Sequence, residues 1–176
     1  MKILIAYAST EGQTRKIVQF CADYLMEEGH NVELLPAADA KDIDLSRFGA
    51  VLLAASVHAG KYQKPLVKLA TAQADALAKM KAAFMSVSLA AAGTDPDDWE
   101  GLKDTVDRFA AKTGWMPQKV MHVAGAFRFS EYDFFKSWAM RWIAAQKEQE
   151  VDPHEDKEYT DWAALRTTLD EWLGDG

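Results

Sequence analysis

Short apolar runs alternate with longer amphipathic segments along most of this chain. Five runs are expected to be strands, at 2–8, 31–35, 50–55, 81–88 and 119–124. A run that is apolar at nearly every position is typical of a parallel strand that is covered on both faces. Helices between such strands require right-handed crossover connections. The pattern therefore predicts an α/β fold built on a doubly wound, five-stranded parallel sheet.

The helices are predicted from their apolar stripes and from the residues at their ends. They are expected at 14–28, 65–80, 94–113 and 161–173. Gly29 and Gly114 are typical of helix C-termini, and Pro65 is tolerated in a first turn. Thr160 is the expected N-cap of the closing helix. Residues 37–48 are polar and weakly patterned, which indicates a loop or a brief helix.

Length, charge and cysteine usage limit what the chain can do. With 176 residues it fits one domain over 1–176, and its formal net charge of -7 argues against nucleic acid as a partner. The single cysteine, Cys21, excludes an intramolecular disulfide and suits a reducing cytoplasm. No apolar stretch approaches the roughly 18 residues that a membrane-spanning helix needs. The four histidines are scattered, so we expect no metal site.

The first predicted strand leads directly into a turn of small polar residues, after which a helix begins. The turn consists of Ser9, Thr10, Glu11, Gly12, Gln13 and Thr14. A helix N-terminus carries unpaired N–H groups and a partial positive charge, and together these bind phosphate. Hydroxyl groups add donors, and glycine lets the backbone approach a ligand closely. The turn therefore predicts a phosphate site of neutral donors, although many βα turns share this composition.

Other phosphate-binding and signalling motifs do not fit the same turn. A Walker loop would end in Gly-Lys-Ser/Thr, and a dinucleotide fingerprint would need spaced glycines, which are missing here. A response-regulator receiver would place acidic residues at the end of the first strand, where this chain has Ala8 and Ser9. These three classes are therefore excluded.

The turn at 9–14 resembles the FMN phosphate signature of flavodoxins. The resemblance implies a flavodoxin-like sheet of order 2-1-3-4-5, with FMN at the carboxyl ends of strands one and three. Loops after the third and fourth strands would then flank the flavin ring. Their expected cofactor contacts are Ser56, Val57, His58, Ala59, Gly60 and Tyr62, followed by Ser88, Leu89, Ala90, Ala91 and Gly93.

Two side chains of the first of these loops have alternative roles. His58 or Tyr62 could flank the isoalloxazine, or Tyr62 could pack on the following helix. The backbone at 56–60 is the candidate for the hydrogen bonds that set the flavin potential. No catalytic acid or base is evident from the sequence.

Later motifs narrow the resemblance to one family. They are Ser86-Val87-Ser88-Leu89, Trp115-x-Pro117, residues 124–129 and Tyr159-Thr160-Asp161-Trp162. Together they resemble the bacterial menaquinone-dependent protoporphyrinogen oxidases over nearly the whole chain. That family implies bound FMN, oxidation of protoporphyrinogen IX in haem biosynthesis, and transfer of electrons to a membrane quinone. Its distinguishing feature is an insert before the last helix, which here covers about 127–158.

The expected insert is rich in aromatic residues, several of them at helical spacing. Phe134 and Trp138 lie four residues apart, so a helix would carry them on one face. They are candidate contacts for a flat apolar porphyrinogen, and Arg128 and Lys136 are candidates for its propionates. The same face could instead touch a membrane surface through 127–146, pack on its own domain, or form a homodimer interface.

Three rival functions remain open at this point. An electron-carrier flavodoxin would have no organic substrate, and its acidic surface would suit basic redox partners. An NAD(P)H-dependent quinone reductase would oxidise a nicotinamide. A binding module that has lost its flavin would fail to take up FMN. The aromatic insert favours an enzyme over a carrier, because a carrier gains nothing from an exposed apolar helix.

Overall fold

The computed structural model describes residues 1–127 and 157–174. Its main sheet contains β1 (Lys2–Ala8), β2 (Asn31–Pro36), β3 (Ala50–Ser56), β4 (Lys81–Ser88) and β5 (Lys119–Ala124). All of the pairings in this sheet are parallel, and the strand order is β2-β1-β3-β4-β5. The predicted order 2-1-3-4-5 is therefore confirmed.

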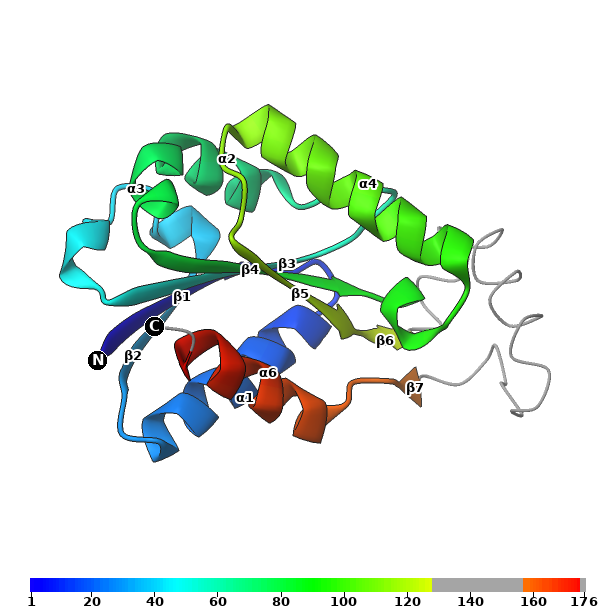
Figure 1. Cartoon of the computed structure of the whole chain (residues 1–176), viewed down its shortest axis with the longest axis horizontal. Coiled ribbons are helices and arrows are strands. Elements are labelled where there is room, and N and C mark those ends of the chain that lie inside the picture. Colours follow the sequence, from blue (N-terminus) through cyan, green and yellow to red (C-terminus); the bar gives the residue numbers. More distant parts are fainter. Residues whose placement is uncertain (128–156, 175–176) are drawn as a thin grey trace.

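Helices cover both faces of the sheet, as Figure 1 shows. One face carries α1 (Gln13–Glu27) and α6 (Trp162–Gly174), whereas the other carries α2 (Lys64–Ala72), α3 (Ala74–Ala78) and α4 (Pro96–Thr113). Successive residues of β1 point into opposite cores, with Leu4 facing the three-helix side and Ile5 facing α1 and α6. Because both faces are covered, the central strands need apolar side chains at nearly every position.

Helix ends follow the sequence signals in part. The side chain of Asp95 caps α4 by accepting a hydrogen bond from Asp97 N at 2.9 Å, and Gly114 ends this helix at φ 78°. The prediction of one helix over 65–80 is wrong, because α2 and α3 are separate and meet at Gln73. The amide of Gln73 donates to the Ile43 carbonyl at 3.0 Å, which ties this break to a neighbouring loop.

The closing helix α6 begins one residue later than Thr160 would require. Asp161 caps it, since its Oδ1 accepts a hydrogen bond from Ala164 N at 3.0 Å. The predicted cap, Thr160, instead donates to the carbonyl of Ala124 at 2.7 Å, which joins α6 to the end of β5. The polar stretch 37–48 forms two short 3-10 helices, at Ala37–Asp39 and Leu45–Arg47.

A second, very small sheet lies beyond the end of β5. Strands β6 (Ala126–Phe127) and β7 (Lys157–Glu158) pair antiparallel, with Ala126 opposite Glu158. In Figure 1 this ribbon lies at the end of the molecule toward which β5 runs. The ribbon therefore joins the two described parts of the chain, and the expected insert lies between its strands.

The described segments also bear on membrane insertion. Within residues 1–127 and 157–174, no helix is both long enough and apolar enough to cross a membrane.

Candidate functional site at the carboxyl edge of the sheet

The turn after β1 leads into the N-terminus of α1. Gly12 is the N-cap residue, with φ 91° and ψ -14°, a left-handed conformation that favours glycine. Its own N–H donates to Ser9 Oγ at 2.9 Å, which closes the turn. Among the described residues no side chain caps this helix, so its first backbone N–H groups stay available to an anion.

A buried hydroxyl group lies in the first turn of the same helix. Thr14 is only 1% exposed, and its Oγ1 has no hydrogen-bond partner within the described parts of the chain. Leaving a buried polar group unpaired costs free energy, and a ligand that accepts a hydrogen bond from this hydroxyl would remove that cost. Ser9 Oγ already accepts a hydrogen bond, which leaves its hydroxyl hydrogen to donate outward. These neutral donors fit a phosphate monoester.

Gln63 connects this turn to the loop that follows β3. Its Nε2 donates to Thr10 Oγ1 at 3.0 Å and to Ser56 Oγ at 2.6 Å, and its Oε1 accepts from Ser56 N at 3.2 Å. Gln63 is not predicted from the sequence, because its only local signal is a polar side chain before a predicted helix. Gln63 therefore fixes two of the three predicted ligand loops relative to one another.

The loop after β3 ends in a tight two-residue turn. His58 and Lys61 pair across it, with His58 N donating to the Lys61 carbonyl at 2.8 Å. The central residues Ala59 and Gly60 have φ angles of 49° and 71°, as a type I′ turn requires. A left-handed alanine is strained by roughly 1–2 kcal/mol. Arg108 on α4 holds the tip, donating from Nη2 to the Gly60 carbonyl at 3.3 Å.

Tyr62 belongs to the core. It is 7% exposed, and its ring packs edge-on against Phe84 and Phe109 with centroids 4.9 and 5.4 Å away. Its hydroxyl shares a hydrogen bond with Ser86 Oγ at 2.8 Å. Burial raises the pKa of Tyr62 to about 12, so the phenol stays protonated at neutral pH. Of the two roles expected for Tyr62, these contacts support packing, and a contact of its side chain with flavin stays a prediction.

The third loop follows β4 and lies beside the second. Val57 N donates to the Val87 carbonyl at 2.8 Å, which joins the second loop to the end of β4, where the third loop begins. Ser88 Oγ accepts from Ala91 N at 3.2 Å and shapes a short 3-10 helix. Trp99, at the start of α4, donates from Nε1 to the Gly93 carbonyl at 2.8 Å. The structure thus brings all three predicted loops to one edge, with Trp99 as an additional neighbour.

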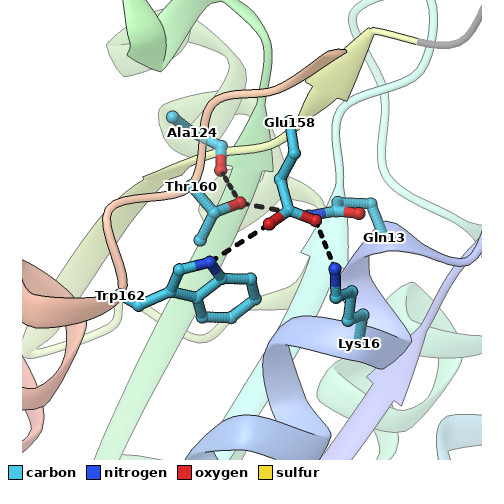
Figure 2. A network of polar contacts seen from close by, with 6 residues as sticks. All are labelled: Gln13, Lys16, Ala124, Glu158, Thr160 and Trp162. Carbon is cyan, nitrogen blue, oxygen red and sulfur yellow. Dashed lines mark hydrogen bonds and ion pairs between the residues drawn. The ribbon is translucent and has the colours of Figure 1, made fainter. Parts of the chain in front are cut away.

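A network of polar contacts joins α1 to the segment before α6 (Figure 2). The Glu158 carboxylate lies between the Lys16 ammonium, at 2.6 Å, and the Trp162 indole N–H, at 3.1 Å. Gln13 Nε2 donates to both Glu158 Oε2 and Thr160 Oγ1, each at 3.1 Å. The hydrogen bond from Lys16 holds the pKa of Glu158 below its usual range. Glu158 is therefore charged at neutral pH.

The four residues expected to meet a substrate are Arg128, Phe134, Lys136 and Trp138, and they lie outside the described residues. Among the other predicted residues, His58 is half-buried beside the type I′ turn, and Glu11 is exposed in the turn at 9–14. Cys21 is fully buried on α1, and burial raises its pKa to about 12. Its thiol is therefore a core group.

The sheet order and the helix N-terminus open to an anion after β1 define the class of flavodoxin-like proteins. The family model described as "Flavodoxin domain" matches residues 4–154, and the chain belongs to this family. FMN is the cofactor of flavodoxins and, through this membership, of this chain. The donor set of the Ser9 and Thr14 hydroxyls and the N-terminus of α1 fits the phosphate of that cofactor.

Solved structures agree on the fold. Oxidised flavodoxin 2 from Bacillus cereus superposes with a TM-score of 0.54 at 18% identity, covering 82% of this chain and 99% of that one. A cysteine-to-serine mutant of the flavodoxin from Pseudomonas aeruginosa gives a TM-score of 0.51 at 20% identity, covering 84% of this chain and 99% of that one. At these identities the likeness concerns the fold alone.

Curated relatives carry a more specific name. A Leishmania major protein named protoporphyrinogen IX dehydrogenase [quinone] is 30% identical over 94% of this chain and 71% of its own length. The Escherichia coli K12 protein of the same name is 27% identical over 92% of this chain and 89% of its own. Family membership and these names support the assignment of the chain as an FMN-dependent oxidoreductase.

Proposed function

We propose that the chain oxidises protoporphyrinogen IX to protoporphyrin IX and passes the electrons from its FMN to a quinone. The names of the relatives supply the substrate and the acceptor, over more than nine-tenths of this chain. The observation that carries the flavin site is the N-terminus of α1, where the buried Thr14 hydroxyl has no partner within the described residues.

In this proposal the phosphate of FMN occupies the turn at 9–14. The first backbone N–H groups of α1 and the hydroxyls of Ser9, Thr10 and Thr14 would donate to its oxygens. No cationic side chain is needed inside the turn, because uncharged donors and the helix dipole balance the phosphate charge. The ion pair between Lys16 and Glu158 is linked to this turn by the side chain of Gln13, which donates to Glu158.

The flavin ring would lie between the loops after β3 and β4. Their small residues allow close approach, and the backbone at 56–60 and the segment 88–93 line the two sides. When bound, FMN would accept electrons from the porphyrinogen in successive two-electron steps, and the quinone would reoxidise it after each step. The protein would orient the ring, and Arg108 and Gln63 would hold the second loop in place.

Substrate contacts stay predictions from the sequence. In this proposal Arg128 and Lys136 meet the propionates, while Phe134 and Trp138 cover the macrocycle. Contact with a membrane surface through 127–146 would bring the protein to a membrane quinone, and a homodimer is the other use of the same residues.

The decisive experiment follows porphyrin fluorescence from protoporphyrinogen IX under anaerobic conditions. The FMN-loaded protein is compared with free FMN, with and without a menaquinone analogue. We expect porphyrin to form only when protein and quinone are both present. A flavin-loaded protein that forms no porphyrin would contradict the proposed reaction. In that case NAD(P)H oxidation would indicate a reductase, and its absence an electron carrier.

A further inference from the structure

The contacts of Glu158 join residues that are far apart in the sequence. Its carboxylate accepts from Lys16 Nζ at 2.6 Å, from Gln13 Nε2 at 3.1 Å and from Trp162 Nε1 at 3.1 Å. Lys16 and Gln13 both belong to the first turns of α1, whereas Glu158 ends β7. A glutamate from the last part of the chain therefore lies directly against the helix that carries the phosphate turn.

This position matters because the ligand of the turn is an anion. Gln13 is the first residue of α1, so the Glu158 carboxylate lies only one glutamine side chain from the backbone N–H groups that face the phosphate. A phosphate monoester carries close to two negative charges at neutral pH. An unpaired carboxylate at that separation would repel it, with only partial screening by salt.

Lys16 offsets this repulsion. Its ammonium pairs with Glu158 and lies 5.6 Å from the centre of the Trp162 ring, so two partners hold it in one place. Arg15 and Glu11 are the neighbouring charges of the turn, and both are exposed. Gln13 is 6% exposed, and the Glu158 carboxylate is one of two acceptors for its buried amide, the other being Thr160 Oγ1.

We propose that Lys16 preserves the preference of this site for a phosphorylated flavin by compensating the charge of Glu158. Glu158 holds Gln13 and the first turn of α1 in place, and Lys16 cancels the charge that this support introduces. The pair therefore leaves the selectivity of the neutral turn for FMN over riboflavin intact. The inference rests on the proposed phosphate site at 9–14.

FMN and riboflavin differ only in the phosphate, so the test compares the dissociation constants of these two ligands. Flavin-free protein is titrated with each ligand at low ionic strength, with flavin fluorescence as the signal. The variants are Lys16→Met, Glu158→Gln and the double variant. Lys112→Met is the matched control, because Lys112 is exposed in the last turn of α4, at the opposite end of that helix from the ligand edge.

We expect Lys16→Met to lower the preference for FMN about 3- to 10-fold, with riboflavin affinity unchanged. Glu158→Gln should raise the preference, since glutamine still accepts from Gln13 and Lys16 becomes an unpaired cation. The FMN preference of the double variant should return to within about twofold of the wild-type preference. Lys112→Met should have the wild-type preference. High salt should reduce the differences, because they arise from charge.

Two results overturn the inference. A Lys16→Met protein with the wild-type preference would show that the phosphate does not sense the pair. Equal losses of FMN and riboflavin affinity would show that the pair only maintains the fold. If the wild type itself does not prefer FMN, the phosphate site at 9–14 is wrong as well, which separates failure of the proposed site from failure of the ion-pair inference.

Discussion

The two loops that meet through Gln63 are built on opposite principles. The turn at 9–14 places a glycine where the backbone is left-handed, closes with a local hydrogen bond to Ser9, and keeps donors available for a ligand. The loop at 56–61 places an alanine in a left-handed conformation. Distant residues hold it there, with Arg108 reaching it from α4 and Val87 from the neighbouring strand.

The donors that can bind an anion therefore lie in the turn at 9–14, whereas the backbone strain lies in the loop at 56–61. A relaxed turn with available donors binds an anion without rearrangement, because its donors are already in place. A strained loop whose backbone groups already have hydrogen-bond partners keeps its conformation only because neighbouring residues hold it. We therefore expect changes in the first loop to alter ligand affinity, and changes in the second to alter stability.

The largest expected effect comes from removing the buried hydroxyl donor of the first loop. Thr14→Val keeps the shape of the side chain, so the flavin-free protein should stay as stable as the wild type. FMN affinity should fall about 10- to 100-fold, because a hydrogen bond to a charged group contributes about 1.5–3 kcal/mol. Titration with FMN measures this change.

Two controls accompany this variant. Riboflavin affinity should not change, because the lost donor serves only the phosphate. Thr71→Val, on the exposed surface of α2, should leave both affinities unchanged. An unaltered FMN affinity in Thr14→Val would mean that the phosphate lies elsewhere.

The next effect concerns the residue that connects the loops. Gln63→Leu removes three hydrogen bonds to Thr10 and Ser56 and should lower the free energy of unfolding by about 2 kcal/mol. Urea unfolding measures the loss. Gln19→Leu is the matched control, because its amide bonds to Asp23 on the surface of α1, and it should cost less than about 0.5 kcal/mol. Equal effects of the two substitutions would contradict a linking role.

The smallest effect exchanges glycine and alanine between the loops. Ala59→Gly should raise the free energy of unfolding by about 0.5–1 kcal/mol, because it relieves a left-handed alanine. Gly12→Ala should lower it by about 1 kcal/mol. A methyl group at Gly12 would meet no described atom within 4 Å, so backbone conformation alone causes that loss. Thermal unfolding of both variants should give shifts of opposite sign, and shifts of the same sign would contradict the comparison.

Most of the fold could be predicted from the sequence, because its signals are local. The strand at 81–88 matches β4 because a buried strand is apolar along its whole length. The helix break at Gln73 could not be predicted, since no glycine or proline marks it and its partner is the distant Ile43 carbonyl. Thr160 and Asp161 are both able to cap a helix, and only the contact of Thr160 with β5 decides between them.

Some residues of the candidate site could also be predicted from local sequence, whereas others depend on contacts that only the fold creates. The turn at 9–14 was predictable because its donors come from consecutive residues. Gln63 and Glu158 were not, since each acts on residues that only the fold brings near. The position of Tyr62 next to the loop in the sequence allows either a flavin contact or a packing role. Its ring turns inward, where Phe84 and Phe109 provide an apolar contact that the sequence does not reveal.

The ribbon of β6 and β7 has a consequence for how this protein can diverge. Because Ala126 pairs with Glu158, the described residues on either side of 128–156 lie next to each other. The entropy of closing a loop changes only slowly with its length, so residues between the two strands can be gained, lost or exchanged at small thermodynamic penalty. The number of residues between the two strands can therefore change while the parallel sheet and the turn at 9–14 stay as they are.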